Sequence, residues 1–151
     1  MKQKRNRNYV VVSPSFHVEK GTKTVVCTMR CCLQLSKVCG IAPSTIHNVM
    51  ADKLPYIKVV EVKNGNNVRY IGGCFVTEGR ATCSGDDTFD FNVGKRIAES
   101  RAKAKAYAKA AKAWKVALKA MEAEIEKIKA VADNCDLSNK TENAHISDLV
   151  K

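Results

Sequence analysis

Four of the seven cysteines cluster in the first forty residues, and cysteine is both a metal ligand and a nucleophile. Cys27, Cys31, Cys32 and Cys39 follow a Cys-x3-Cys-Cys-x6-Cys spacing, which differs from the paired Cys-x2-Cys motifs typical of tetrahedral zinc sites. Cys27 and Cys31 stand at even spacing in a strand-like stretch, so small buried side chains explain them more simply. We therefore predict no structural metal and no required disulfide.

The start of the chain indicates the compartment. Tyr9–Val12 is the only apolar stretch near the start, too short for the core of a signal peptide and for a membrane span. We expect a cytoplasmic protein with reduced cysteines and no membrane partner.

Sequence signatures of catalysis are missing. The chain has neither a Walker-type phosphate loop nor a Gly-x-Ser-x-Gly nucleophile elbow, and its three histidines share no metal-ligand spacing. Asp86, Asp87 and Asp90 lie close together and have the chemistry to hold a cation or to act as an acid/base pair. Capping of a helix start is the simpler interpretation, because acids there complement the helix dipole. We expect a protein that is not an enzyme and needs no cofactor.

Segment 82–107 combines aromatic and basic residues at the predicted start of a helix. Phe89 and Phe91 precede that start, where free backbone N–H groups attract anions. A nucleotide base can stack on such a ring while arginine holds its phosphates. The alternative is a hydrophobic staple, with one ring packed on the first helical turn, and the spacing fits both. The candidate ligand-binding residues are Phe89, Phe91, Asn92, Lys95, Arg96, Arg101 and Lys105.

The charge of the chain favours anionic partners. The 26 Lys and Arg residues outnumber the 15 Asp and Glu residues, giving a formal net charge of +11. Segment 95–119 concentrates this charge, with nine basic residues against the single acid Glu99. A solvated surface is the alternative explanation for a basic protein.

Several short strands are predicted before this basic segment. Strand-like patterns cover residues 9–13, 22–35, 56–63, 68–71 and 74–82, with Pro14 ending the first. Asn64-Gly65 predicts a hairpin turn, and Gly72-Gly73 permits a bend or bulge. Ser44 is a suitable cap for a short helix that ends near Met50.

A long helix is predicted from near Asn92 to beyond residue 130, rich in alanine, lysine and glutamate. An a/d heptad repeat, here called the seam, predicts helix–helix packing. Its residues are Ile97, Ser100, Ala104, Tyr107, Ala111, Trp114, Leu118, Met121, Ile125, Ile128 and Ala132. A helix of ~40 residues spans ~60 Å, more than one small sheet covers. It therefore either breaks and folds back or docks on another copy.

These elements predict an α+β fold: a small antiparallel β-sheet followed by a long C-terminal α-helix that packs in a homo-oligomer. The expected organisation is a flexible basic arm over residues 1–8, a sheet region over 9–83, a loop and long helix over 84–133, and a tail over 134–151.

The stretch from Cys83 to Lys105 contains Phe89-Asp90-Phe91, Gly94, Ile97-Ala98-Glu99 and Arg101-Ala102. It resembles a segment of small phage proteins, and among these the phage anti-Thoeris sponges, which sequester cyclic nucleotide immune signals without cleaving them. The resemblance covers about a sixth of the chain. It implies dimers that build a hexamer, ligand sites between protomers, and binding roles for Phe89, Phe91 and Arg101.

Two functions follow as expectations. The first is a phage counter-defence protein, acting in the host bacterial cytosol, that sequesters cyclic ADP-ribose-like molecules or cyclic oligonucleotides without cleavage. The alternative is a basic nucleic-acid-binding accessory protein, in which the helix and the arm Lys2–Arg7 follow a phosphate backbone. A nucleic-acid binder requires cations along an open face, whereas a sponge requires them in pockets beside aromatic rings.

Overall fold

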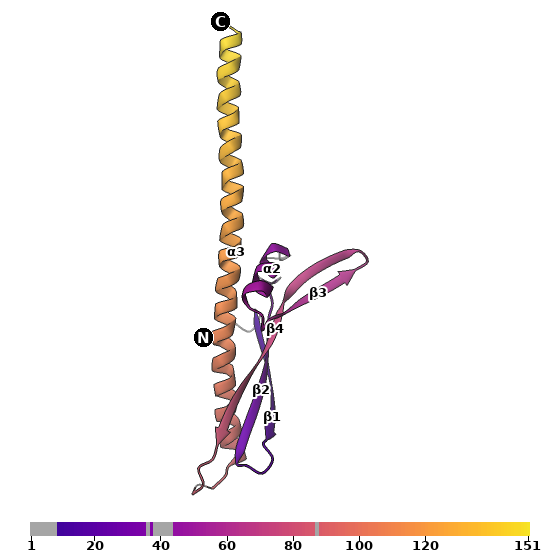
Figure 1. Cartoon of the computed structure of the whole chain (residues 1–151), viewed down its shortest axis with the longest axis vertical. Helices are drawn as coiled ribbons and strands as arrows, with labels where there is room; N and C mark the ends of the chain where they lie inside the picture. Colours follow the sequence, from indigo (N-terminus) through magenta and orange to yellow (C-terminus); the bar gives the residue numbers. More distant parts are fainter. Residues whose placement is uncertain (1–8, 36, 38–43, 87) are drawn as a thin grey trace. The chain divides into compact units, whose positions relative to one another are not determined.

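The structure is a computed structural model that describes residues 9–35, 37, 44–86 and 88–151. The predicted arm over residues 1–8, Cys39 and Asp87 lie outside the described residues. The chain divides into two compact units, Met1–Ala117 and Leu118–Lys151, which are described separately below. Figure 1 shows the order of the elements along the chain.

Four antiparallel strands form one sheet: β1 (Val10–Val18), β2 (Thr24–Leu33), β3 (Lys58–Asn64) and β4 (Asn67–Thr82). Their order across the sheet is β1-β2-β4-β3, and the long helix follows in sequence. The predicted α+β class, with a small antiparallel sheet before a long helix, is confirmed. The segments 68–71 and 74–82 belong to the one strand β4, because Gly72-Gly73 continues it opposite a register shift at Val60/Glu61.

The predicted turn at Asn64-Gly65 is confirmed, whereas the predicted end of a strand at Pro14 is not. Asn64-Gly65 makes the predicted hairpin between β3 and β4, with Asn64 opposite Asn67 and a positive φ of 61° at Gly65. The prediction that Pro14 ends the first strand is wrong, since β1 continues through Val18. Pro14 is tolerated because β1 is an edge strand, where a missing N–H need not break the ladder.

The predicted short helix is confirmed as α2 (Ser44–Lys53). Ile46 and Met50 are buried on it, one turn apart, as is Leu54 directly after its end. The spacing of these apolar side chains places them on one helical face, so α2 packs that face into the core of the first unit.

Helix α3 (Phe91–Leu149) is continuous over 59 residues, so the alternative in which it breaks is wrong. The prediction that it ends near residue 133 and leaves a tail is also wrong. The polar residues beyond that point bond within the helix instead of ending it. Thr141 Oγ1 donates to the Leu137 carbonyl at 3.0 Å, and Ser147 Oγ donates to the Asn143 carbonyl at 3.1 Å.

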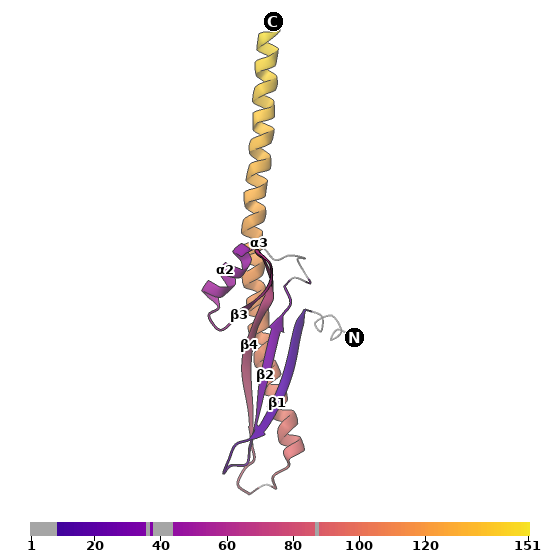
Figure 2. The same cartoon turned by 90° about the vertical axis from the view of Figure 1, so that its right-hand side faces the viewer.

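In the first unit, α3 lies along one face of the sheet, as Figure 2 shows. A face of six buried alanines makes the contact: Ala98, Ala102, Ala106, Ala110, Ala113 and Ala117. Gly79 of β4 lies so close that a Cβ there would clash with the backbone of Ala98 and Ala102. Thr77 Oγ1 donates to the Ala102 carbonyl at 2.9 Å, which joins strand and helix at the same point.

The sheet side of this core consists of alternate residues of β2 and β4. Val25, Cys27, Met29 and Cys31 are fully buried, and Phe75 of β4 is 4% exposed. The prediction that Cys27 and Cys31 are small buried side chains on a strand is confirmed.

The predicted seam is not the face that packs on the sheet. In the first unit its members Ile97 and Tyr107 remain 41% and 40% exposed, while the alanines beside them are buried. In the second unit Leu118 and Ile128 are 55% and 68% exposed. The seam is thus available on each unit, and its use in oligomerisation stays a prediction.

Gly79→Ala tests the close contact between α3 and β4. The added methyl group meets rigid backbone rather than a flexible side chain, so we expect a loss of about 1–3 kcal/mol in the free energy of unfolding. Gly85→Ala is the control, since nothing lies within 4 Å of its Cβ position. Urea denaturation should find Gly85→Ala within about 0.5 kcal/mol of wild type. Equal effects would contradict the contact.

Candidate functional site

The N-terminus of α3 is capped by the side chain of Asp90. Its Oδ1 accepts hydrogen bonds from the backbone N–H groups of Asn92 at 2.9 Å and Val93 at 3.2 Å. The helix begins at Phe91, next to the start predicted near Asn92, and the predicted capping role is confirmed for Asp90. The carboxylate already occupies N–H groups that would otherwise attract an anion, which weakens this helix start as a phosphate site.

A hollow of about 520 Å³ lies between the end of β4 and the start of α3. Phe89 and Ile97 form part of its wall, with the hydroxyl groups of Ser84 and Thr88 nearby. Among the described residues that line it, Asp90 is the only charged one. The hollow offers an aromatic surface and hydroxyl groups, but its charge has the wrong sign for a phosphate.

The other predicted ligand-binding residues in the first two turns of α3 do not line this hollow. Phe91 is 40% exposed and does not line the hollow. Lys95 Nζ lies 4.6 Å from the ring centroid of Phe16 in β1, a cation–π contact. Arg96 is exposed. Sequence spacing missed Phe16 because the strand pairing, not the neighbouring sequence, brings it to α3.

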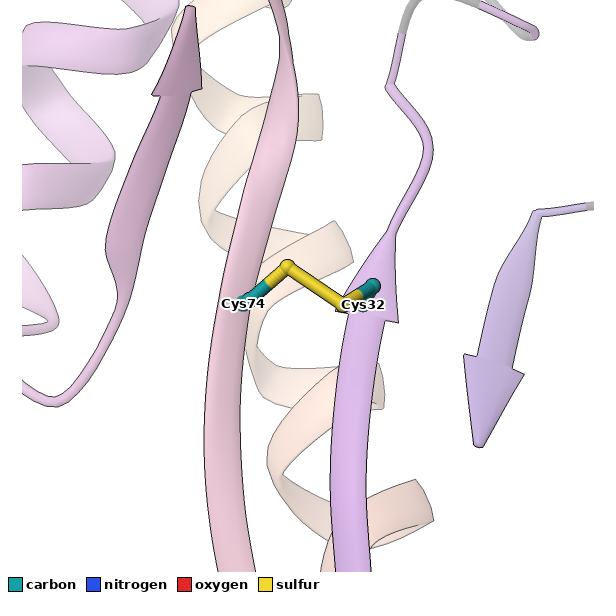
Figure 3. The surroundings of a disulfide bond; sticks show 2 residues. All are labelled: Cys32 and Cys74. Carbon is teal, nitrogen blue, oxygen red and sulfur yellow. A yellow bond between two sulfur atoms is a disulfide. The ribbon is translucent and has the colours of Figure 1, made fainter. Parts of the chain in front are cut away.

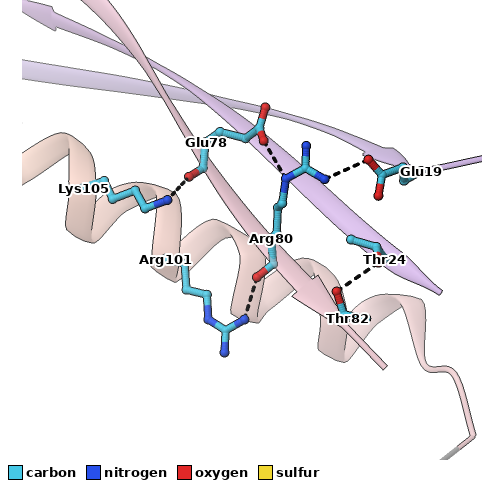
Figure 4. Close-up of polar contacts among 7 residues, drawn as sticks. All are labelled: Glu19, Thr24, Glu78, Arg80, Thr82, Arg101 and Lys105. Carbon is cyan, nitrogen blue, oxygen red and sulfur yellow. Dashed lines mark hydrogen bonds and ion pairs between the residues drawn. The ribbon is translucent and has the colours of Figure 1, made fainter. Parts of the chain in front are cut away.

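Arg101 and Lys105 lie at the free edge of β4, as Figure 4 shows. Beyond Cys74, β4 has no pairing with β3, so one edge of the strand lacks a neighbouring strand among the described residues. Arg101 Nη1 donates to the Arg80 carbonyl at 2.6 Å, and Lys105 Nζ donates to the Glu78 carbonyl at 2.8 Å. The two cations thus satisfy edge carbonyls and blunt this edge against pairing.

On the same stretch of β4, the Arg80 side chain bridges two acids. Its guanidinium lies 2.8 Å from Glu19 and 2.8 Å from Glu78 (Figure 4), and the hydrogen bonds to these acids raise the pKa of Arg80. This exposed network joins the β1–β2 turn to β4.

Four exposed cations of α3 share one side of the helix in the first unit: Arg101, Lys105, Lys112 and Lys115. Their spacing of four, seven and three residues keeps them within one quarter of the helical circumference. We call this set the basic stripe. Lys103 and Lys109 are excluded, because Lys103 pairs with Glu99 at 2.8 Å and Lys109 lies 4.7 Å from the Tyr56 ring. The basic stripe is an open row of positive charge.

The sequence-predicted site therefore does not form one pocket within the chain. Phe89 lines the hollow, whereas Phe91 and Asn92 lie on the exposed first turn of α3. Lys95 contacts β1, while Arg101 and Lys105 lie at the edge of β4.

A second hollow of about 520 Å³ was missed by sequence reasoning. Its wall includes Arg30 of β2, Lys58 of β3, and Cys74, Phe75 and Tyr56. The last two rings meet edge to face, with centroids 5.6 Å apart. Here two exposed cations, Arg30 and Lys58, accompany the half-buried ring of Tyr56, whereas Phe75 is only 4% exposed. Only the pairing of three strands brings these residues together.

Cys32 of β2 and Cys74 of β4 form a disulfide, shown in Figure 3. The expectation that all cysteines are reduced is wrong for this pair. The register of β2 and β4 sets them directly opposite, with Cα atoms 4.2 Å apart, although 42 positions separate them in sequence. The strand alternation turns Cys32 away from the face that buries Cys31 and Leu33.

The remaining described cysteines differ in reactivity. Cys31 is buried, and this burial raises the pKa of its thiol to about 11. Burial likewise raises the pKa of Cys27. Cys135 is exposed. Among the described residues, no group of three or more His, Cys, Asp or Glu side chains is arranged to hold a metal ion.

No family model, no curated protein and no solved structure matches this chain. None of the helices in the described ranges combines the length and apolar character needed to cross a membrane.

Reduction should lower the stability of the protein, because the Cys32–Cys74 bond closes a long segment in the unfolded chain. For a closure of this length we expect a loss of about 2–4 kcal/mol in the free energy of unfolding. The double substitution Cys32→Ala/Cys74→Ala should lose a similar amount. Cys135→Ala is the matched control, since its thiol is exposed. Urea denaturation with and without reductant makes the comparison, and identical midpoints would contradict a stabilising disulfide.

Proposed function

We propose that this chain is a non-catalytic nucleic-acid-binding protein whose basic stripe contacts backbone phosphates. The observation that carries the proposal is the exposure of Arg101, Lys105, Lys112 and Lys115 along one side of α3. An open row of cations suits an extended polyanion better than a small ligand, which needs an enclosing pocket.

The stripe also fits the chemistry of backbone recognition. Lysine ammonium groups act as point charges toward phosphates and release condensed counterions, so binding depends steeply on salt and little on base sequence. Arg101 and Lys105 each donate a hydrogen bond to a β4 carbonyl, and these bonds hold the two charged groups in place. Lys112 and Lys115 extend the row and make no hydrogen bond to β4 within the described residues, so they are suited to follow a flexible backbone.

Fluorescence anisotropy with labelled DNA and RNA at several salt concentrations tests this proposal. Four phosphate contacts predict a slope of roughly −3 to −4 for log K against log salt concentration. Lys112→Ala should reduce the magnitude of that slope by about 1 for every sequence tested. Lys112→Glu/Lys115→Glu should abolish measurable binding at physiological salt.

Lys127→Glu/Lys140→Glu is the matched control, because it changes the net charge equally at exposed positions of the second unit. If it weakens binding as much as the change in the stripe, total charge rather than the stripe is responsible. Absence of binding at low salt would remove the nucleic-acid function.

A cyclic nucleotide sponge is the second candidate, favoured by the hollow beside β3. In this function the half-buried ring of Tyr56, which packs against the buried Phe75, offers an aromatic surface to a base, while Arg30 and Lys58 attract its phosphates. The resemblance to anti-Thoeris sponges points instead to Phe89, Phe91 and Arg101. In that case the partner protomer must supply cations, since Asp90 is the only charged residue among the described ones that line the Phe89 hollow.

Titration calorimetry with cyclic ADP-ribose isomers and with cyclic di- and trinucleotides distinguishes these sites. Lys58→Ala should weaken binding if the hollow beside β3 is used, whereas Phe89→Ala should leave it unchanged. The opposite pattern, with Arg101→Ala costing ~1.5–3 kcal/mol, would favour the site implied by the resemblance. Failure of all ligands to bind, or recovery of a degraded ligand, would remove the sponge function.

A further inference from the structure

The second unit, Leu118–Lys151, presents an apolar row along its helix. In the heptad frame of the seam, the a positions are Leu118, Ile125, Ala132, Asn139 and Ile146, and the d positions are Met121, Ile128, Cys135, Glu142 and Leu149. Eight of these ten side chains are apolar or thiol-bearing. The largest are well exposed on the single chain, with Leu118 at 55%, Ile128 at 68% and Leu149 at 70%. An exposed apolar row of this kind is removed from water only when a partner covers it.

We propose that residues 118–149 form a parallel, in-register, two-stranded coiled coil with the same segment of a second copy of this chain. The repeat recurs over more than four heptads, which is the length at which a/d periodicity favours a coiled coil. This goes beyond the proposed function, because it concerns the second unit and needs no ligand.

Asn139 determines the orientation and the register. A polar residue at a single a position is best accommodated when it meets the same residue of the partner and the two amides hydrogen-bond. A shifted register or an antiparallel pair would place the Asn139 amide against an apolar side chain, where its hydrogen bonds are lost. Asn143 Nδ2 donates to Asn139 Oδ1 at 3.1 Å on the single chain, which leaves the amide donors of Asn139 for the partner.

Charge complementarity at the flanks supports the same arrangement. Glu124 is at a g position and Lys129 is at the e position of the next heptad, and these positions meet between the chains of a parallel dimer. Each dimer would contain this opposite-charge pair twice. On the single chain these residues pair only within the helix, Glu124 with Lys127 at 3.1 Å and Lys129 with Glu126 at 3.2 Å, all on the surface.

Glu142 is the weak point of the row, since a d position brings two like charges together in the dimer. The dimer is therefore best packed over residues 118–135. Cys135 lies at the end of that part, at a d position and exposed on the single chain. In the proposed register its thiol faces the same thiol of the partner, so an oxidant that removes two hydrogens, such as diamide, joins the two sulfur atoms.

Ile128→Glu and Leu137→Glu are a matched pair for testing the interface. The two side chains are similarly exposed on the single chain, at 68% and 63%, but Ile128 occupies a d position and Leu137 an f position. Sedimentation equilibrium should show at least a 100-fold rise in the dimer dissociation constant for Ile128→Glu and less than a twofold change for Leu137→Glu. Glu142→Leu should lower the same constant at least tenfold. Equal behaviour of the matched pair, or a monomeric wild type at tens of micromolar, would overturn the proposal.

Diamide crosslinking tests the orientation. Wild type should give a covalent dimer on a non-reducing gel, and Cys135→Ser should not. In the Cys135→Ser background, Leu149→Cys should restore the crosslink, because a parallel dimer sets position 149 against itself. An antiparallel dimer would set it near residue 118 instead. A dimer by sedimentation that Leu149→Cys fails to crosslink would overturn the parallel arrangement.

Discussion

The contact of the alanine face of α3 with β4 at Gly79 determines how the first unit is built. With no side chain at Gly79 and only methyl groups at Ala98 and Ala102, the helix backbone reaches the strand closely enough for Thr77 to bond a helical carbonyl. A larger residue at any of these positions would separate the two layers, because packed cores leave no spare volume. Close packing of two backbones also means that side chains flanking the contact reach the strand edge.

The distribution of charge follows from that contact. Arg101 and Lys105 flank the alanine face and meet the carbonyls of the unpaired edge of β4. The helix thus uses one side for packing and the next for the basic stripe, while the seam residues Ile97 and Tyr107 remain exposed. The packing face, the basic stripe and the exposed seam residues therefore lie on different sides of α3 in the first unit, and a substitution on one side need not disturb the others.

The hollow at the start of α3 and the hollow beside β3 differ in charge, and charge decides which ligands they suit. At the start of α3, the Asp90 carboxylate accepts hydrogen bonds from the helix N-terminus. Its negative charge makes the adjoining hollow unfavourable for phosphate. Beside β3, Arg30 and Lys58 accompany the half-buried ring of Tyr56 next to the Cys32–Cys74 bond. More of the binding residues predicted from sequence lie near the first hollow. The second hollow, however, carries the positive charge that attracts a phosphate.

The sequence by itself determined the elements that depend on near neighbours. The Asn64-Gly65 turn, the short helix α2 and the existence of a long alanine-rich helix all rest on local backbone preferences. The pattern predicts too early an end for that helix, because polar residues such as Thr141 are typical of turns but here hydrogen-bond within the helix. Tertiary structure alone decided which face of α3 is buried, that Cys32 meets Cys74, and that Lys95 lies over Phe16. Each of these depends on strand register or on the approach of two distant backbones. A sequence periodicity, of two residues in a strand or seven in a helix, defines a face of the element but not the element that packs against it.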